Sequence, residues 1–181
     1  MGTAKARLIC LASFSALQCA TPVLADDSPY KKVRGWSLYR NETNCSAYMM
    51  FENGEAVGFA YDAPGRSTRV TFSDAHAASL KDGDSPTIDM LLRKTDGTVD
   101  HAWEGTVFMV SVDRDGRRTL TSRWLGPPAL ENFRTAAFIG FFNGNREIGV
   151  FNLAGTAAAL EEMQHCAMRL HDIDPRDAFA D

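Results

Sequence analysis

After its first residues the sequence has no apolar run long enough to span a membrane. A membrane helix needs about 20 consecutive apolar residues, and the stretch from Leu8 to Ala20 is shorter. Clustered basic residues are also missing, because 19 Lys and Arg are spread among 23 Asp and Glu, for a formal net charge of -4. Nucleic acid attracts clustered Lys and Arg. We therefore expect no membrane span and no nucleic-acid partner.

Familiar catalytic and cofactor-binding motifs are absent as well. There is no Gly-x-Ser-x-Gly elbow, no P-loop, no glycine-rich dinucleotide turn, and no HExxH spacing among the four histidines. The Asp-rich stretches at 82–89 and 113–115 do not match EF-hand spacing and fit turns better. We expect no cofactor and no metal. We also expect a non-catalytic protein in preference to an enzyme. The open alternative is a hydrolytic site assembled in space from dispersed residues such as Asp89, His101 and Glu104.

The N-terminus has the organisation of an export signal. Lys5 and Arg7 precede the apolar stretch, and Val23-Leu24-Ala25 has the small-residue pattern of a cleavage site. Residues 1–25 are therefore a predicted signal peptide, and cleavage moves the formal charge from -4 to about -6 because it removes two cations. Gln18 before Cys19 is a poor fit to a lipidation signal. We expect a periplasmic or secreted product.

Cysteine is scarce once the signal peptide is removed. Only Cys45 and Cys166 remain in the mature chain. An exported chain with two cysteines most simply forms one disulfide, and closing a loop of this length stabilises by roughly 5 kcal/mol in the chain-entropy model. The alternative is that both thiols are free and buried.

The clearest hairpin signal lies near the start of the domain. The segments Ser46–Phe51 and Ala56–Tyr61 flank Asn53-Gly54, which suits a two-residue loop. That loop predicts a register with Met50 opposite Val57 and Tyr48 opposite Phe59. The small residues Ala56, Gly58 and Ala60 would then leave room on one face, where we expect the C-terminal helix to lie.

A second hairpin and an amphipathic helix close the chain. Residues 137–142 and 147–153 flank Asn143-Gly144-Asn145, and the apolar character of both faces of the return strand favours a central pair of strands. Thr156 is placed to cap a helix. Apolar residues then recur at helical spacing and form one stripe, with Cys166 beside it. The stripe consists of Leu160, Met163, Ala167 and Leu170.

Together these patterns predict an α+β domain, mainly an antiparallel sheet with the C-terminal amphipathic helix packed on it and one disulfide. We expect a loose leader at 26–33, one globular domain at 34–172 and a flexible tail at 173–181. The other expected elements are strands at 34–40, 69–72, 87–93, 103–112 and 119–125, and short helices at 74–80 and 127–135.

Aromatic and basic side chains on the predicted strands offer a possible binding surface for a protein or a glycan. Arg34 and Arg40 lie at the two ends of the first expected strand. The alternative interpretation places each tryptophan in the core and each arginine at a solvated edge. The candidates are Trp36, Trp103, Trp124, Arg93 and Arg123.

Two short stretches resemble the invasion-associated locus B family, which comprises exported, β-rich α-proteobacterial proteins linked to host-cell entry. They are Gly35-Trp36 followed by Cys45, and the late segment from Phe151 to Ala158. The resemblance implies a bacterial periplasmic or envelope setting and no catalytic residue. The sequence thus favours an exported interaction module for an unknown protein or envelope component, with an inhibitor of an exported hydrolase or a hydrolytic enzyme as alternatives.

Overall fold

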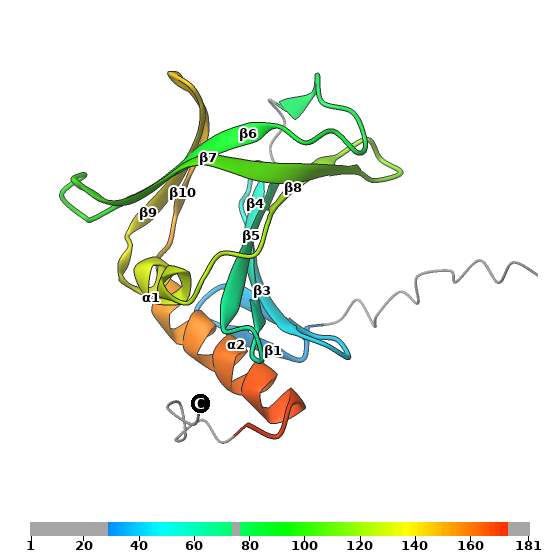
Figure 1. The fold of residues 1–181 in the computed structure, drawn as a ribbon, viewed down its shortest axis with the longest axis vertical. Helices are drawn as coiled ribbons and strands as arrows, with labels where there is room; N and C mark the ends of the chain where they lie inside the picture. The colour runs from blue at the N-terminus through cyan, green and yellow to red at the C-terminus, as the bar shows by residue number, and fades with distance from the viewer. Residues whose placement is uncertain (1–28, 74–76, 174–181) are drawn as a thin grey trace, which may run out of the picture.

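The computed structural model describes residues 29–73 and 77–173, which form one ten-stranded antiparallel sheet and two helices (Figure 1). The predicted signal peptide at 1–25 lies outside the described residues. No helix in the described ranges is long and apolar enough to cross a membrane. The α+β class is confirmed.

The elements are β1 (Lys31–Val33), β2 (Trp36–Arg40), β3 (Cys45–Met50), β4 (Ala56–Asp62), β5 (Ser67–Ser73), β6 (Thr87–Arg93), β7 (Val99–Val112), β8 (Arg118–Ser122), α1 (Pro128–Thr135), β9 (Phe138–Asn143), β10 (Arg146–Asn152) and α2 (Thr156–Leu170).

The sheet curls because β7 is long and bends. The strand order is β1-β2-β3-β4-β5-β8-β7-β6-β9-β10. The residues of β7 up to Val107 pair with β6, and those from Phe108 onward pair with β8. Gly105, with a φ of +63°, lies at an irregularity of the β6–β7 pairing. Asp89 supports this bend, since its Oδ1 accepts the Gly105 N–H at 2.7 Å. In Figure 1, β6 and β7 consequently cross above β3, β4 and β5.

Aromatic side chains fill the interior between the two halves of the curled sheet. Phe72 of β5 stacks on Phe141 of β9, with ring centroids 3.9 Å apart. The ring of Phe133 in α1 packs on that of Phe59 in β4, with centroids 4.9 Å apart, and the ring centroid of Trp36 lies 5.6 Å from that of the same Phe59. All five rings are fully buried or nearly so. Burial of apolar surface at about 25 cal/mol per Å² makes this interior the main stabilising feature of the domain.

The helix α2 lies on the inner side of β2, β3 and β4, as its apolar stripe predicts. Leu160, Met163 and Ala167 have no exposed surface, and Leu170 is half-buried. Figure 1 shows the helix running below the strands of this half of the sheet. The apolar spacing in the sequence therefore identified the buried face of the helix correctly.

The start of α2 differs from the prediction. Thr156 is the first helical residue rather than the cap, and the capping position belongs to Gly155, whose φ is +79°. The physical reason is the close approach of the β1–β2 turn, because a Cβ on Gly155 would meet the carbonyl oxygen of Arg34 at 3.0 Å. Glycine is the residue that tolerates both the left-handed φ and the contact.

The register of the β3–β4 hairpin also differs from the prediction. Met50 pairs with Ala56 and Tyr48 with Gly58, one residue away from the expected register. The loop has three residues, because the Phe51 N–H donates to the carbonyl of Glu55 and the Gly54 N–H donates to that of Phe51. Gly54 takes a φ of +83°, as in a type I turn followed by a glycine bulge.

This change of register turns the small residues to the opposite face. Gly58 and Ala60 lie on the side of the sheet away from α2, whereas Val57, Phe59 and Tyr61 face the helix and are buried. The expectation that α2 covers the small residues was therefore wrong. Tyr48, directly across from Gly58, occupies the space that they leave.

Two further expectations fail at the edges of the sheet. β10 pairs only with β9 in the strand order and forms one edge, so this hairpin is not a central pair. Its apolar face is covered through Phe151, which contacts Phe51 from the other half of the sheet at 5.3 Å. At the opposite edge, β1 (Lys31–Val33) forms within the expected loose leader and pairs with β2.

β1 is fastened to α2 by an ion pair. The Lys31 Nζ lies 2.7 Å from an Oε of Glu162, and this hydrogen bond is the main cause that lowers the pKa of the Glu162 carboxyl. A depressed carboxyl pKa stabilises the fold at pH values above the ordinary pKa, and that contribution is lost as the pH falls through the lowered value. Because the Lys31 side chain is 47% exposed, solvent screening limits the contribution of this ion pair to the free energy of unfolding to about 0.2–1 kcal/mol.

We expect Glu162→Gln to lower the free energy of unfolding by less than about 1 kcal/mol at pH 7, and the difference from wild type to vanish at an acidic pH below the lowered pKa of Glu162. Urea titration of both proteins at the two pH values measures this. Glu161→Gln on the exposed side of the same helix is the matched control. A difference of the same size at both pH values would contradict the role of the ion pair.

Candidate functional site

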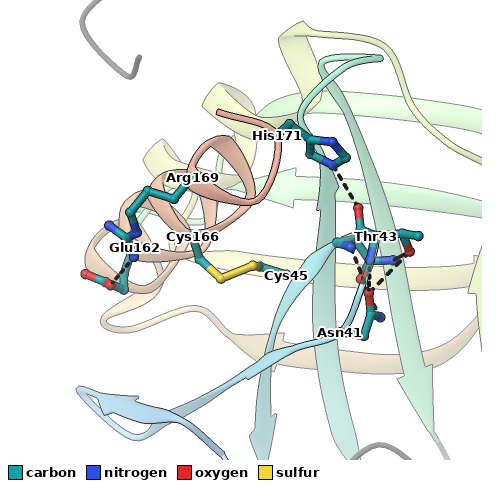
Figure 2. The surroundings of a disulfide bond; sticks show 8 residues. Asn41, Thr43, Cys45, Glu162, Cys166, Arg169 and His171 are labelled. Atoms are coloured by element: carbon teal, nitrogen blue, oxygen red, sulfur yellow. Dashed lines mark hydrogen bonds and ion pairs between the residues drawn. A yellow bond between two sulfur atoms is a disulfide. The ribbon is translucent and has the colours of Figure 1, made fainter. Parts of the chain in front are cut away.

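The disulfide predicted from cysteine counting is present and lies inside the fold. Cys45 begins β3, Cys166 lies in α2, and their Cα atoms are 6.0 Å apart (Figure 2). Neither cysteine is more than 3% exposed. Above the bond in Figure 2, an imidazole nitrogen of His171 lies 3.1 Å from the carbonyl oxygen of Thr43 and joins the helix end to the β2–β3 turn. The bond is thus a structural fastening between α2 and the sheet.

The predicted aromatic and basic surface is not one surface. Trp36 is entirely buried, and its indole N–H donates to the carbonyl of Ala154 at 3.2 Å. Trp103 is half-buried and packs on Phe133 of α1. Trp36 therefore belongs to the core, as the alternative interpretation held, and Trp103 packs on that core.

The remaining candidates lie on different parts of the sheet. Trp124 follows β8 and is 38% exposed, with the guanidinium of Arg69 over its ring at 4.2 Å. Arg123 beside it is exposed, whereas Arg93 is half-buried at the end of β6. Only Trp124 and Arg123 are neighbours on an accessible surface.

The residues suggested for a hydrolytic site are separated by the pleat of β6 and β7. His101 pairs with the buried Leu92, and its ring packs on that of Trp103 with the centroids 4.2 Å apart. On β6, Asp89 lies between two buried residues and therefore points to the face opposite to that of Leu92. There its carboxylate accepts the Gly105 N–H. Glu104 is exposed. Across 29–73 and 77–173, no group of three or more His, Cys, Asp or Glu could hold a metal ion.

The face of the sheet that α2 does not cover carries a different set of side chains. We call the outward side of β3, β4, β5 and β8 the outer face. One row of paired residues crosses it, and its members are small or hydroxylated except for one tyrosine. The row consists of Tyr48, Gly58, Thr71 and Thr121.

Tyr48 lies flat on the backbone of Gly58. A Cβ built on Gly58 would come 2.2 Å from the Cδ1 and 2.3 Å from the Cε1 of Tyr48, so one face of the ring rests where a side chain would be. The rings of Tyr39 and Tyr48 pack edge to face, with their centroids 5.9 Å apart. Burial is the main cause that raises the pKa of the Tyr48 phenol. The ring is thus held in one orientation on the outer face.

We expect Gly58→Ala to lower the free energy of unfolding by about 1–3 kcal/mol, because the new methyl group displaces the Tyr48 ring. In a Tyr48→Ala background the same change should cost much less, since no ring remains to be displaced. Chemical denaturation of the four proteins measures this coupling. Equal costs in both backgrounds would contradict the contact.

A groove opens where two hairpin tips flank the end of β5. Ser73 is the last residue of β5 and lies between Ala56 of β4 and Thr119 of β8. Two adjoining hollows of about 310 and 220 Å³ share Ser73 and Arg117 in their walls. We call them together the hairpin groove. Its other lining residues are Asn53, Gly54, Glu55, Asp115, Gly116 and Arg118 in the larger hollow, and Tyr48, Ala56, Val57, Gly58, Thr71, Phe72, Asp113 and Thr119 in the smaller one.

Hydrogen bonds hold the two tips of the groove in place. The Oδ1 of Asp113 accepts the N–H groups of Asp115 and Arg117, at 3.0 and 2.8 Å. The Oδ1 of Asn53 accepts the N–H of Glu55 at 3.1 Å. The acidic and amide residues of these turns therefore shape the backbone, which agrees with turn chemistry rather than with a calcium loop.

Ser73 is the unusual residue of the groove. It is 5% exposed, and its Oγ makes no hydrogen bond to the part of the chain that the structure describes. Buried hydroxyl groups nearly always have a partner. The Oγ atom itself is inaccessible to solvent, so Ser73 lines the groove without presenting this hydroxyl to a ligand.

Comparison of the chain with protein-family models, with curated proteins and with solved structures finds no match. The assignment of a site therefore rests on the geometry of the hairpin groove.

Proposed function

We propose that the mature chain is an exported, non-catalytic binding module that recognises an envelope component or a secreted partner through the hairpin groove. The observation that carries this proposal is the groove itself, whose two tips are held in place by the hydrogen bonds that Asp113 and Asn53 accept. Largely preformed concave surfaces with a few convergent polar groups are the usual form of binding sites. The separation of Asp89 from His101 favours binding over hydrolysis.

The signal-like residues at 1–25 and the buried disulfide support the exported setting. We also propose kinship with the invasion-associated locus B family. In support, the two stretches that carry the resemblance contact each other in the fold. The Trp36 indole N–H reaches the Ala154 carbonyl, and Gly155 lies against Arg34.

Export has a direct test. The protein isolated from the producing cell should have an intact mass that corresponds to a chain starting near Asp26, because the signal peptide is removed at Ala25. Mass spectrometry of the periplasmic and culture fractions measures this. A full-length product confined to the cytoplasm would contradict the proposal.

The binding role is tested with immobilised mature protein and envelope extract. We expect wild-type protein to retain a component that Arg117→Ala fails to retain, because Arg117 lines both hollows. Glu161→Ala, which changes an exposed residue of α2, is the matched control and should behave as wild type. Equal retention by all three proteins would place the binding surface elsewhere.

A further inference from the structure

We propose that the hairpin groove binds a neutral saccharide, with one sugar ring stacked on Tyr48. This inference rests on the proposed function and names the class of ligand. It follows from three features of the groove: an aromatic platform, a wall of hydroxyl groups, and a mixture of charges that does not favour an ionic ligand.

The platform is the ring of Tyr48. Its contact with Gly58 fixes one face against the sheet, and Tyr48 lines the smaller hollow. An aromatic ring has a negative face, and the C–H groups on one side of a pyranose carry a small positive charge. A sugar ring can therefore stack on Tyr48 while its hydroxyl groups remain at the rim.

The smaller hollow that Tyr48 lines is also rich in hydroxyl residues. Thr71, Ser73 and Thr119 lie on neighbouring strands and line the same hollow. A Ser or Thr hydroxyl can both donate and accept a hydrogen bond, and so can each hydroxyl of a sugar. The Thr71 hydroxyl lies 3.3 Å from that of Thr121, and a hydroxyl that makes one hydrogen bond can still make another with a saccharide hydroxyl.

The charges of the larger hollow are of both signs. Arg117, Arg118, Asp113 and Asp115 belong to the β7–β8 tip, and Glu55 belongs to the β3–β4 tip. Arg118 is already occupied, since its Nε donates to the Leu80 carbonyl at 2.8 Å. This balance does not favour a phosphate or another anion. Carboxylate and guanidinium groups instead suit the adjacent hydroxyl pairs of a neutral sugar, as acceptors and donors respectively.

The size of the groove fits a short saccharide. The larger hollow, of about 310 Å³, lies at the lower end of the roughly 300–1,000 Å³ typical of small-molecule sites, and the adjoining hollow adds about 220 Å³. A disaccharide could place one ring on Tyr48 and extend the second toward Arg117 between the tips.

The test is titration of isotope-labelled mature protein with four neutral disaccharides, namely N,N′-diacetylchitobiose, cellobiose, maltose and lactose, followed by amide chemical shifts. At least one should shift the amides of Gly58, Thr71 and Ser73. Tyr48→Ala should weaken its binding at least about tenfold, and Thr71→Val by about three- to tenfold. Tyr48→Phe keeps the platform and should bind as wild type, which separates loss of the ring from loss of folding.

Absence of groove shifts with all four sugars at about 10 mM, or unchanged binding by Tyr48→Ala, would overturn the saccharide assignment. The two proposals fail separately. If no sugar binds but Arg117→Ala still loses the envelope component, the binding module stands and its ligand is not a saccharide.

Discussion

Replacement of Cys45 by serine is expected to lower the free energy of unfolding of the mature protein by about 5 kcal/mol. The disulfide joins residues 121 positions apart, and the chain-entropy model gives roughly this value for such a loop. The bond also holds α2 against the first residue of β3. Urea denaturation of the mature protein, with and without the substitution, measures the effect.

Cys166→Ser should cost a similar amount, and the double substitution should cost little more than either single one, because both remove the same bond. A non-reducing digest should contain one peptide pair that joins the two residues. Clearly additive losses, or two free thiols in the native mature protein, would contradict the fastening.

Met163→Asp should destabilise the domain by several kcal/mol. Met163 has no exposed surface and lies in the middle of the buried stripe of α2. The substitution buries an unpaired carboxylate in an apolar environment, which is among the most costly single changes. Chemical denaturation should show a large fall in the transition midpoint, or the protein should fail to fold.

Two variants separate burial from helix propensity. Met163→Leu keeps the volume and apolar character, and should cost less than about 1.5 kcal/mol. Glu161→Ala changes an exposed position two residues away and should remain within about 0.5 kcal/mol of wild type. A change of that small size for Met163→Asp would mean that the stripe faces solvent.

The parts of the fold that the sequence predicts correctly depend on local periodicity or on counting. The helical spacing of Leu160, Met163 and Ala167 identified the buried side of α2. The count of two cysteines outside the predicted signal peptide identified the disulfide. The strand at 87–93 was predicted with its observed bounds, because alternation and the Asp96-Gly97 turn both mark it.

The register of the first hairpin was harder to predict. Asn-Gly suits either a two-residue loop or a three-residue loop with a glycine bulge. The structure has the second, and the Lys94–Thr98 and Asp113–Arg117 hairpins close with the same hydrogen bonds. A slip of one residue exchanges the two faces of a strand. This single choice therefore moved Gly58 from the expected helix interface to the outer face.

The groove was not predictable from sequence patterns, because it depends on non-local pairing. β5 pairs with β8 and not with β6, which follows it in the chain. Only this pairing brings the tips near Asn53 and Asp115 to the two sides of Ser73. The available signals were the small residues of β4 and the two turn motifs, but neither indicates which strands are neighbours.

The most direct test of the hairpin groove as the functional surface is photo-crosslinking in the producing cell. A photoreactive phenylalanine derivative at position 117, which lines both hollows, should give a discrete adduct. The same residue at position 161, exposed on α2, should give none. Adduct formation at 161 but not at 117 would contradict the assignment of the binding surface to the hairpin groove.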